Sequence, residues 1–332
     1  MGKKTSNLAG LSRYVLEALK TSQEESVEVS DSKRHDANGE TGPPAKRRKA
    51  ETMISRPEKY DATGLVPHYR DAYQVPEHLQ KYFSQRKRYF SLYDEGCLLD
   101  EEGWFSVTPE RVANQIAERC RCDTILDAFC GVGGNAIAFA KTCERVIALD
   151  IDPTRLALAR HNAAIYGVAD RIDFILVDYL TFIESYLSLP SGSVRKIDVI
   201  FLSPPWGGPS YLSGLPAEST PPLGSDLGPP SVEGHPEYSL ESIQPIHGAK
   251  LFQLSRQVTC NIAYFLPRNT SLEEISALLL QDGSDSREVS RKDENADSHP
   301  EVAEIEEEWM GTKLKALTCY FGGLVGGQEH LF

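Results

Sequence analysis

Short apolar runs alternate with amphipathic stretches along the second two thirds of this chain. The apolar runs predict buried strands at 124–129, 145–149, 172–177, 197–202 and 261–266. The stretches between them predict helices at 109–119, 135–142, 153–166 and 247–255. Two further runs, 302–309 and 314–321, predict a closing hairpin around Gly311. This alternation predicts seven strands in a mostly parallel sheet, with helices on both faces.

Residues at the ends of two helices support these limits. Thr108 is a plausible N-cap for the 109–119 helix, and Pro109 suits a first helical position. Gly167 directly follows the 153–166 helix, where glycine commonly ends a helix. We therefore expect the first helix to begin at Pro109 and the third to stop at Gly167.

Composition divides the chain into three parts. Residues 1–58 are polar and poor in aromatics, which predicts a disordered tail. Residues 59–108 alternate aromatic and basic side chains, which predicts a helical extension containing one amphipathic helix over 76–93. Residues 109–332 form the α/β domain, with a Pro/Gly/Ser-rich insertion at 213–236 and an acidic, structureless one at 281–300.

Charge is unevenly spread along the 332 residues, although the net value is −13. Residues 282–308 hold eleven acidic and three basic side chains, whereas 46–49 and 86–88 are basic runs. Because screening limits electrostatic reach to about 10 Å, the acidic total does not exclude RNA. The Pro-Pro-Ala-Lys-Arg-Arg-Lys run at 43–49 favours a nuclear import signal over a merely solvated basic run.

We expect neither a membrane span nor a metal site. The sequence contains no run of eighteen apolar residues, so we predict no membrane span. Seven cysteines occur, but no two have the Cys-x-x-Cys spacing of common zinc sites.

A glycine-rich turn, Asp-Ala-Phe-Cys-Gly-Val-Gly-Gly-Asn at 127–135, joins the first predicted strand of the domain to the following helix. Glycines allow a ligand to approach the backbone closely, and a helix N-terminus favours a negative group such as a carboxylate. The third glycine directly follows the second, which departs from the Gly-x-Gly-x-x-Gly pattern of dinucleotide enzymes. With Asp127 at its start, this turn instead resembles the first motif of class I S-adenosylmethionine-dependent methyltransferases; the alternative is a purely structural turn.

Acidic residues follow the next two predicted strands. Asp150 ends the 145–149 strand, where a carboxylate can accept both hydroxyls of a ribose. Asp152 competes for that role, but Pro153 follows it, so we interpret Asp152 mainly as a helix cap. Asp178 follows the 172–177 strand and could accept from an adenine amino group; the alternative is a solvated aspartate at a strand end.

Residues 203–208 read Ser-Pro-Pro-Trp-Gly-Gly, directly after the 197–202 strand. Neither proline has an N–H to donate, so the carbonyls of Ser203 and Pro204 are available to accept from another group. The exocyclic amine of a nucleobase is such a donor, and Trp206 offers a surface for stacking. The alternative is a strand stopped by two prolines beside a half-buried tryptophan.

Together these motifs resemble the trimethylguanosine synthase family of RNA cap guanine-N2 methyltransferases, within the class I S-adenosylmethionine-dependent methyltransferases. The resemblance covers about 76–332 apart from the insertions and rests on the blocks 102–109, 127–135, 147–153, 201–209 and 264–269. It implies a Rossmann-like methyltransferase domain and a small helical extension that helps to close the cofactor and cap pockets.

The resemblance also implies a function. S-adenosylmethionine would donate two methyl groups in succession to the N2 amine of a 7-methylguanosine cap, giving 2,2,7-trimethylguanosine on small nuclear and nucleolar RNAs. It implies a monomeric nuclear enzyme, nucleolar or Cajal-body-like with a cytoplasmic pool, that meets capped RNA and snRNP or snoRNP proteins and needs no metal. The alternatives are an amino-methyltransferase for an internal guanine or adenine of RNA or DNA, and a non-catalytic cap-binding scaffold.

Site residues follow from the motifs and the resemblance. The expected catalytic residues are Ser203, Pro204 and Trp206. The expected cofactor contacts are Asp127, Phe129, Gly131, Gly133, Asn135, Asp150, Ile151 and Asp178. The expected substrate contacts are Trp206, Pro205, Arg268, Arg86 and Asn269. One departure is Ser84, where the family often carries a phosphate-contacting lysine, so a neighbouring basic residue would have to replace it.

Overall fold

The structure is a computed structural model that describes residues 60–190, 195–207, 237–285 and 301–326. The predictions of a disordered tail and import signal within 1–58, and of the 213–236 insertion, lie outside these ranges.

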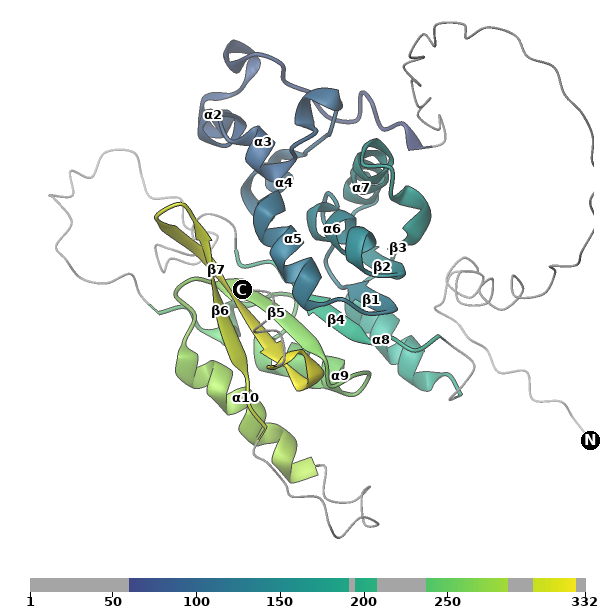
Figure 1. The fold of residues 1–332 in the computed structure, drawn as a ribbon, viewed down its shortest axis with the longest axis vertical. Helices are drawn as coiled ribbons and strands as arrows, with labels where there is room; N and C mark the ends of the chain where they lie inside the picture. The colour runs from purple at the N-terminus through teal and green to yellow at the C-terminus, as the bar shows by residue number, and fades with distance from the viewer. Residues whose placement is uncertain (1–59, 191–194, 208–236, 286–300, 327–332) are drawn as a thin grey trace, which may run out of the picture.

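Among the described residues, seven strands form one sheet in the order β3-β2-β1-β4-β5-β7-β6 (Figure 1). The strands are β1 (Thr124–Asp127), β2 (Arg145–Asp150), β3 (Ile172–Leu176), β4 (Val199–Leu202), β5 (Ile262–Pro267), β6 (Glu304–Met310) and β7 (Lys313–Phe321). β1 to β5 pair in parallel, whereas β7 runs antiparallel to both β5 and β6. The predicted sheet and its closing hairpin are confirmed, with Gly311 at φ 63° in the turn.

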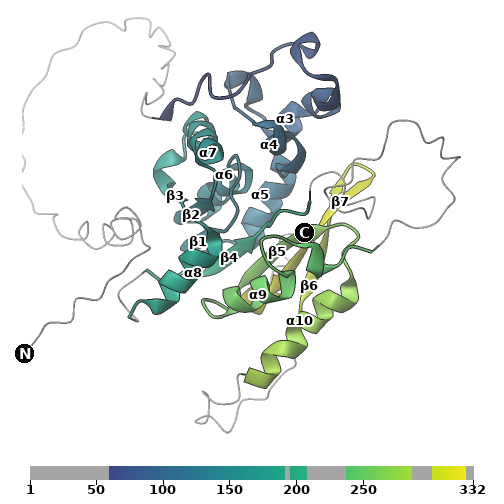
Figure 2. The same cartoon turned by 180° about the vertical axis from the view of Figure 1, so that it is seen from behind.

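Helices cover both faces of the sheet (Figures 1 and 2). The helices are α2 (Gln80–Phe83), α3 (Arg86–Tyr89), α4 (Glu101–Ser106), α5 (Glu110–Arg119), α6 (Gly134–Thr142), α7 (Pro153–Ile165), α8 (Tyr179–Ser188), α9 (Gly248–Arg256) and α10 (Leu272–Asp285). Short 3₁₀ turns lie at Ala72–Gln74, Glu77–Leu79, Tyr93–Glu95, Ala169–Arg171, Leu240–Ser242 and Gly322–Leu324. Residues of α5, α6 and α7 pack in one hydrophobic cluster, and those of α8, α9 and α10 in a second.

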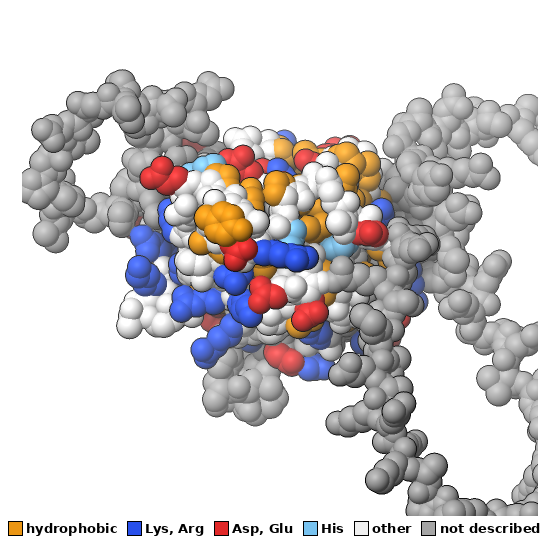
Figure 3. All heavy atoms as spheres, turned by 90° about the horizontal axis from the view of Figure 1, so that it is seen from above, with side chains coloured by type: hydrophobic (Ala, Val, Ile, Leu, Met, Phe, Trp, Pro, Cys, Tyr) orange, Lys and Arg blue, Asp and Glu red, His pale blue; other side chains and the backbone are white. Residues whose placement is uncertain are grey.

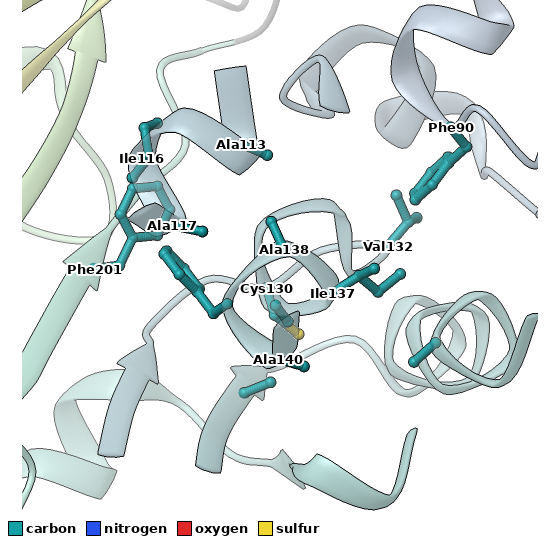
Figure 4. Packing of buried hydrophobic residues seen from close by; sticks show 14 of the residues in the cluster. Phe90, Ala113, Ile116, Ala117, Cys130, Val132, Ile137, Ala138, Ala140 and Phe201 are labelled. Atoms are coloured by element: carbon teal, nitrogen blue, oxygen red, sulfur yellow. The ribbon is translucent and has the colours of Figure 1, made fainter. Parts of the chain in front are cut away.

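The central strands are buried along their whole length, which explains their uninterrupted apolar sequence. Phe201 of β4 faces Ile116 and Ala117 of α5 (Figure 4), and its ring lies 5.1 Å from that of Phe139 on α6. The order of strands reverses between β1 and β4, and in open α/β sheets such a switch point positions a ligand crevice at the carboxyl ends of the strands.

The single helix expected over 76–93 is wrong. The backbone carbonyl of Lys81 accepts from the Ser84 hydroxyl at 2.8 Å and from the Gln85 side-chain amide at 3.1 Å. The N–H of Gln85 bonds instead to the carbonyl of Tyr82, 2.8 Å away. Side chains that compete for a helical carbonyl favour a break, and the segment divides into α2 and α3.

Three other limits differ from the sequence-based expectations. Thr108 does not cap α5, because its hydroxyl accepts from the side-chain amide of Asn135 at 3.0 Å. Pro109 is the capping residue, with ψ 134°, and the helix begins at Glu110. The segment 281–300 is not structureless throughout, since α10 continues to Asp285.

The extension packs on the same hydrophobic cluster as the α5–α7 layer. Its Phe90, Tyr93 and Trp104 are each at most 2% exposed. Phe90 points toward Val132 of the glycine-rich turn (Figure 4). Residues 60–108 therefore share their core with the α/β domain, directly beside the predicted cofactor turn. Within the described ranges, no helix combines the length and apolarity that a membrane crossing requires.

Candidate active site

The glycine-rich turn is fixed to the end of β2 by backbone hydrogen bonds. The N–H of Gly131 donates to Oδ2 of Asp150 at 2.9 Å, and the N–H of Cys130 donates to the carbonyl of Leu149 at 2.8 Å. Gly131 has φ 51°, which a residue without a side chain adopts most easily. Two of the predicted cofactor residues, Gly131 and Asp150, are thus in direct contact.

Gly133 allows α6 and α7 to approach each other. It is the N-cap residue of α6 with φ 91°, and a Cβ there would lie 3.1 Å from both Cα and Cβ of Ala159 on α7. Asn135, the second residue of α6, is 8% exposed, and its side-chain amide donates to Thr108. Its predicted cofactor contact stays a prediction; the contact that the structure gives it joins α6 to the extension.

Asp150 has the environment expected of a ribose-binding carboxylate. Besides the bond from Gly131, its Oδ1 accepts from the N–H of Asp152 at 2.8 Å. Each oxygen therefore has a backbone donor and retains a lone pair for a ligand hydroxyl. Burial raises the pKa of Asp150 above its usual range. Asp152 caps α7 as predicted, accepting from the N–H groups of Thr154 and Arg155 at 2.7 and 3.2 Å.

Asp127, the last residue of β1, is a fully buried carboxylate. Among the described residues, no hydrogen bond of standard geometry reaches either of its oxygens. Burial raises its pKa to about 7, and the backbone N–H groups of Phe129 and Ala136 lower it in part. A buried carboxylate whose neighbouring N–H groups miss hydrogen-bond geometry is costly unless a ligand or water donates to it, so Asp127 is suited to a cationic group.

A buried asparagine of α7 links the extension to the glycine-rich turn. The Nδ2 group of Asn162 donates to the carbonyls of Leu98 and Val132, each at 2.9 Å. Its Oδ1 accepts from the N–H of Leu98 at 2.7 Å. Asn162 is fully buried, and sequence reasoning missed it because an asparagine within a helix carries no signal of its partners.

The loop after β4 meets the glycine-rich turn at one contact. The hydroxyl of Ser203 donates to the carbonyl of Phe129 at 3.4 Å. Pro204 is buried, whereas Pro205 is exposed and its carbonyl accepts from the N–H of Gln244 at 3.4 Å. Within the described part of the chain, no group donates to the carbonyl oxygens of Ser203 or Pro204. That both carbonyls accept from a ligand amine stays a prediction.

Trp206 is half-buried at the end of this loop. Its ring centroid lies 5.2 Å from that of Phe265 on β5, with 32° between the two planes. Its backbone carbonyl accepts from the hydroxyl of Tyr238 at 3.3 Å. Phe265 thus supports one side of the indole. The sequence placed Phe265 in the apolar 261–266 strand but did not predict its contact with Trp206.

The remaining predicted cofactor residues have mixed surroundings. Phe129 is half-buried, and its ring lies 5.5 Å from that of Tyr179. Ile151 is 70% exposed, an aliphatic side chain outside the core at the end of β2. Asp178 caps α8, because its Oδ2 accepts from both the N–H and the hydroxyl of Thr181. Its contact with an adenine stays a prediction, alongside this structural role.

The predicted phosphate contacts differ in their charge environment. Arg86 lies 3.4 Å from a carboxylate oxygen of Asp94, and its guanidinium lies 4.4 Å from the ring centroid of Phe83. Arg268 follows β5 and donates to the carbonyl of Leu314 at 3.4 Å. Asn269, next in the chain, accepts at its backbone carbonyl from Tyr238. Asp94 thus offsets the charge of Arg86, whereas Arg268 has a neutral partner.

These residues fit S-adenosylmethionine. The buried carboxylate of Asp127 suits the ammonium of the methionine part, and the glycine-rich N-terminus of α6 suits its carboxylate. Asp150 suits the ribose hydroxyls. In the part of the chain that the structure describes, no three His, Cys, Asp or Glu side chains are arranged to hold a metal ion.

Comparison with known proteins agrees with this geometry. A family model described as RNA cap guanine-N2 methyltransferase matches residues 122–214 and 219–324. Trimethylguanosine synthase of Schizosaccharomyces pombe is 39% identical over 208 residues, which are 61% of this chain and 76% of that protein. Trimethylguanosine synthase of Saccharomyces cerevisiae is 34% identical over 205 residues, which are 60% of this chain and 57% of that protein.

Among solved structures, the delta-N METTL16 MTase domain aligns with a TM-score of 0.42 and 12% sequence identity. The alignment covers 75% of this chain and 97% of that one. The strand order of the sheet, and not this alignment, carries the description of the fold.

Proposed function

This chain belongs to the RNA cap guanine-N2 methyltransferase family, and from that premise we propose that it methylates the N2 amine of 7-methylguanosine caps on small nuclear and small nucleolar RNAs. It is an S-adenosylmethionine-dependent enzyme. The names of its yeast relatives support trimethylguanosine as the product, reached by two successive transfers to the same nitrogen.

One observation carries the proposal: the Ser203 hydroxyl contacts the Phe129 carbonyl at 3.4 Å. Phe129 belongs to the turn that fits the methyl donor, and Ser203 begins the loop that fits the methyl acceptor. The contact joins the ends of two adjacent parallel strands, which supports donor and acceptor sides that lie next to each other. Such positioning is the main requirement for transfer between two bound groups.

The acceptor nitrogen needs orientation more than it needs a strong base. The lone pair of the guanine N2 amine is delocalised into the ring, which makes it a weak nucleophile. When bound, S-adenosylmethionine supplies a methyl group on a positively charged sulfur that leaves readily as a thioether. The carbonyls of Ser203 and Pro204 accept from the amine hydrogens and direct its lone pair toward that methyl group. The N–C bond forms as the S–C bond breaks, and the nitrogen then releases a proton to solvent water.

Trp206 supports selection of a methylated cap. A 7-methyl group gives guanine a positive charge, and a cation over an indole is favoured by about 0.5–2 kcal/mol. Phe265 holds the indole from one side, which limits the freedom of the ring that would stack on the base. An unmethylated guanine lacks this charge and should bind more weakly.

The cellular setting is a further part of the proposal. We propose that the enzyme acts as a monomer in the nucleus, in nucleolar or Cajal-body-like sites with a cytoplasmic pool, and that it meets its RNAs with snRNP or snoRNP proteins. The basic run at 43–49 supports nuclear import.

The test is methyl transfer with labelled S-adenosylmethionine and RNA carrying a 7-methylguanosine cap. After digestion, the label should appear in 2,7-dimethylguanosine and then in 2,2,7-trimethylguanosine. Label in an internal guanosine or adenosine would instead identify an amino-methyltransferase of the RNA body. Cap binding without any transfer would identify a scaffold. Either outcome would contradict the proposal.

A further inference from the structure

Two cysteine side chains lie in contact at the amino ends of β1 and β2. The Sγ atoms of Cys122 and Cys143 are 3.8 Å apart. Cys122 comes two residues before β1, whereas Cys143 directly follows α6 and comes two residues before β2. Both are free cysteines in this structure, and the candidate active site uses neither of them. We call these two residues the thiol pair.

Strand pairing holds the thiol pair side by side. Thr124 of β1 is in register with Arg145 of β2, and two places earlier Cys122 lies opposite Cys143. The ladder reaches this point, because the N–H of Glu144 donates to the carbonyl of Cys122 at 3.4 Å. Neighbouring strands lie about 4.8 Å apart, and a disulfide needs Cα atoms about 4.4–6.8 Å apart. From their 3.8 Å separation the sulfurs need to approach by about 1.8 Å to bond.

The contact between the two thiols favours loss of one proton from the pair. The hydrogen bond from the Cys122 thiol lowers the pKa of Cys143 to about 7, while burial raises it in part. The same hydrogen bond raises the pKa of Cys122. The singly ionised pair therefore shares one proton between two sulfurs. A thiolate is the nucleophile in disulfide exchange, so this pair is more reactive than two separate buried cysteines.

A reagent in solution can reach one member of the thiol pair. Cys122 is half-buried, whereas Cys143 is 2% exposed. An external disulfide would therefore react at Cys122, and Cys143 would complete the exchange from inside the protein. The nearby Cys120 is fully buried, and burial raises the pKa of its thiol, so it stays protonated.

The thiol pair encloses the cofactor turn without touching it. The chain between its two cysteines contains β1, the glycine-rich turn at 127–135 and α6. In Figure 1, α5 leads away from the extension, and Cys122 follows its C-terminal end by three residues. Figure 3 shows the molecule from the side of the extension, where acidic and basic side chains mix with hydrophobic ones. A reagent reaches Cys122 from the other end of α5.

We propose that Cys122 and Cys143 form a reversible disulfide by exchange with glutathione disulfide, which closes the segment that carries the cofactor turn into a covalent loop. Disulfides of cytosolic and nuclear proteins are usually of this transient, redox-sensing kind. The inference concerns the fold around the turn and is independent of which methyl acceptor the enzyme uses.

The exchange takes two steps. The thiolate of Cys122 attacks one sulfur of glutathione disulfide; that S–S bond breaks, and one glutathione leaves. The thiolate of Cys143 then attacks Sγ of Cys122 in the mixed disulfide and releases the second glutathione. Each leaving glutathione takes up the proton that the attacking thiol has released. Two protein thiols are oxidised, and one glutathione disulfide is reduced to two glutathione thiols.

The experiment equilibrates the full-length protein in glutathione buffers of increasing oxidised fraction and then alkylates the remaining thiols. Trypsin cleaves after Arg121 and Lys141, so the two members of the thiol pair fall in separate peptides, 122–141 and 142–145. Mass spectrometry should find these peptides joined in a rising fraction of the protein, and dithiothreitol should separate them. The oxidised protein should unfold at a temperature several degrees higher, because the disulfide restricts the unfolded chain.

Variants identify the bonded cysteines, because Cys130 shares the first peptide with Cys122. Cys122→Ser should abolish both the joined peptides and the rise in unfolding temperature, and Cys143→Ala should do the same. Cys260→Ser is the control: it removes an exposed cysteine before β5 and should leave both results unchanged. Thermal unfolding under reducing conditions confirms that each variant is folded.

Three results would overturn the inference. The first is the absence of joined peptides in the folded wild type, even with glutathione disulfide alone. The second is joined peptides that persist in Cys122→Ser, which would assign the bond to Cys130. The third is glutathione that remains on Cys122 as a stable mixed disulfide, which would show that Cys143 does not reach it. None of these results bears on methyl transfer, which has its own test.

Discussion

The indole of Trp206 lies against the phenyl ring of Phe265, with centroids 5.2 Å apart. The first ring ends a loop after β4, and the second belongs to the neighbouring strand β5. This pair converts a half-buried tryptophan into a supported surface for a base. It also connects the acceptor loop to the strand that leads to Arg268.

Changes at Trp206 should separate substrate binding from cofactor binding. Trp206→Ala removes the stacking surface, so we expect kcat/KM for capped RNA to fall at least tenfold, given about 0.5–2 kcal/mol for the cation–π contribution plus lost contact area. The affinity for S-adenosylmethionine, measured by calorimetry, should stay close to that of the wild type.

Phe265→Leu is the matched change on β5, because it keeps an apolar side chain but removes the supporting ring. It should raise KM for capped RNA by a smaller factor than Trp206→Ala. Loss of cofactor affinity in both variants would mean that the pair is structural.

Asp150 at the end of β2 and Asp152, two residues later, should have different roles. Asp150→Asn replaces an oxygen that accepts a backbone N–H with a donor, and it removes the charge that favours ribose hydroxyls. Hydrogen bonds to charged groups contribute about 1.5–3 kcal/mol each, so cofactor affinity should fall about tenfold to a hundredfold.

The control for this change is Asp152→Asn, at the N-cap of α7. It should lower the unfolding temperature slightly and leave cofactor affinity close to the wild-type value. Equal losses of cofactor affinity in the two variants would contradict the separate roles.

The buried Asn162 should be critical for stability. Asn162→Ala leaves the carbonyls of Leu98 and Val132 without their donor, and each unsatisfied buried group costs about 1–3 kcal/mol. We expect the free energy of unfolding, from urea titration, to fall by about 3 kcal/mol or more. Asn114→Ala, on α5, removes only a 3.4 Å contact with Lys141 and should have little effect. Similar losses in both would show that the link between extension and turn is weak.

Glu308 should make stability depend on pH. It is 1% exposed, and burial raises its pKa from 4.5 to about 7, although the Thr318 hydroxyl donates to it at 2.5 Å. Between these values the folded state keeps a proton that the unfolded state has lost. Stability therefore falls as pH rises through this window, by about 3 kcal/mol in total, and stays lower above pH 7.

Glu308→Gln removes this titration. Its unfolding temperature relative to the wild type should therefore rise between pH 4.5 and 7. Glu307→Gln, at an exposed neighbour, measures the effect of losing any carboxylate from β6. The same pH trend in both variants would contradict the role of burial.

Much of the fold follows from local sequence signals. Apolar runs mark β1 to β5, and Pro153 and Gly167 bracket α7, because these residues act on their own backbone. The break between α2 and α3 could not be predicted, since Ser84 and Gln85 act only by competing for the carbonyl of Lys81. The helices α4, α8 and α10 were not predicted at all.

The candidate site divides in a similar way. Gly131, Asp150 and Ser203 lie on consecutive strand ends, so a parallel sheet brings them together once its order is known. Asp94 beside Arg86 and Phe265 beside Trp206 depend on packing between separate segments, which the sequence does not display.

The central claim is that Trp206 selects a positively charged cap guanine whose amine faces the Ser203 and Pro204 carbonyls. The most direct measurement is the ratio of kcat/KM for RNAs with a 7-methylguanosine cap and with an unmethylated guanosine cap, in the wild type and in Trp206→Ala. The wild-type ratio should be about ten or more, with the new methyl groups on N2, and it should approach one in the variant. A wild-type ratio near one, or a ratio unchanged by Trp206→Ala, would contradict the account.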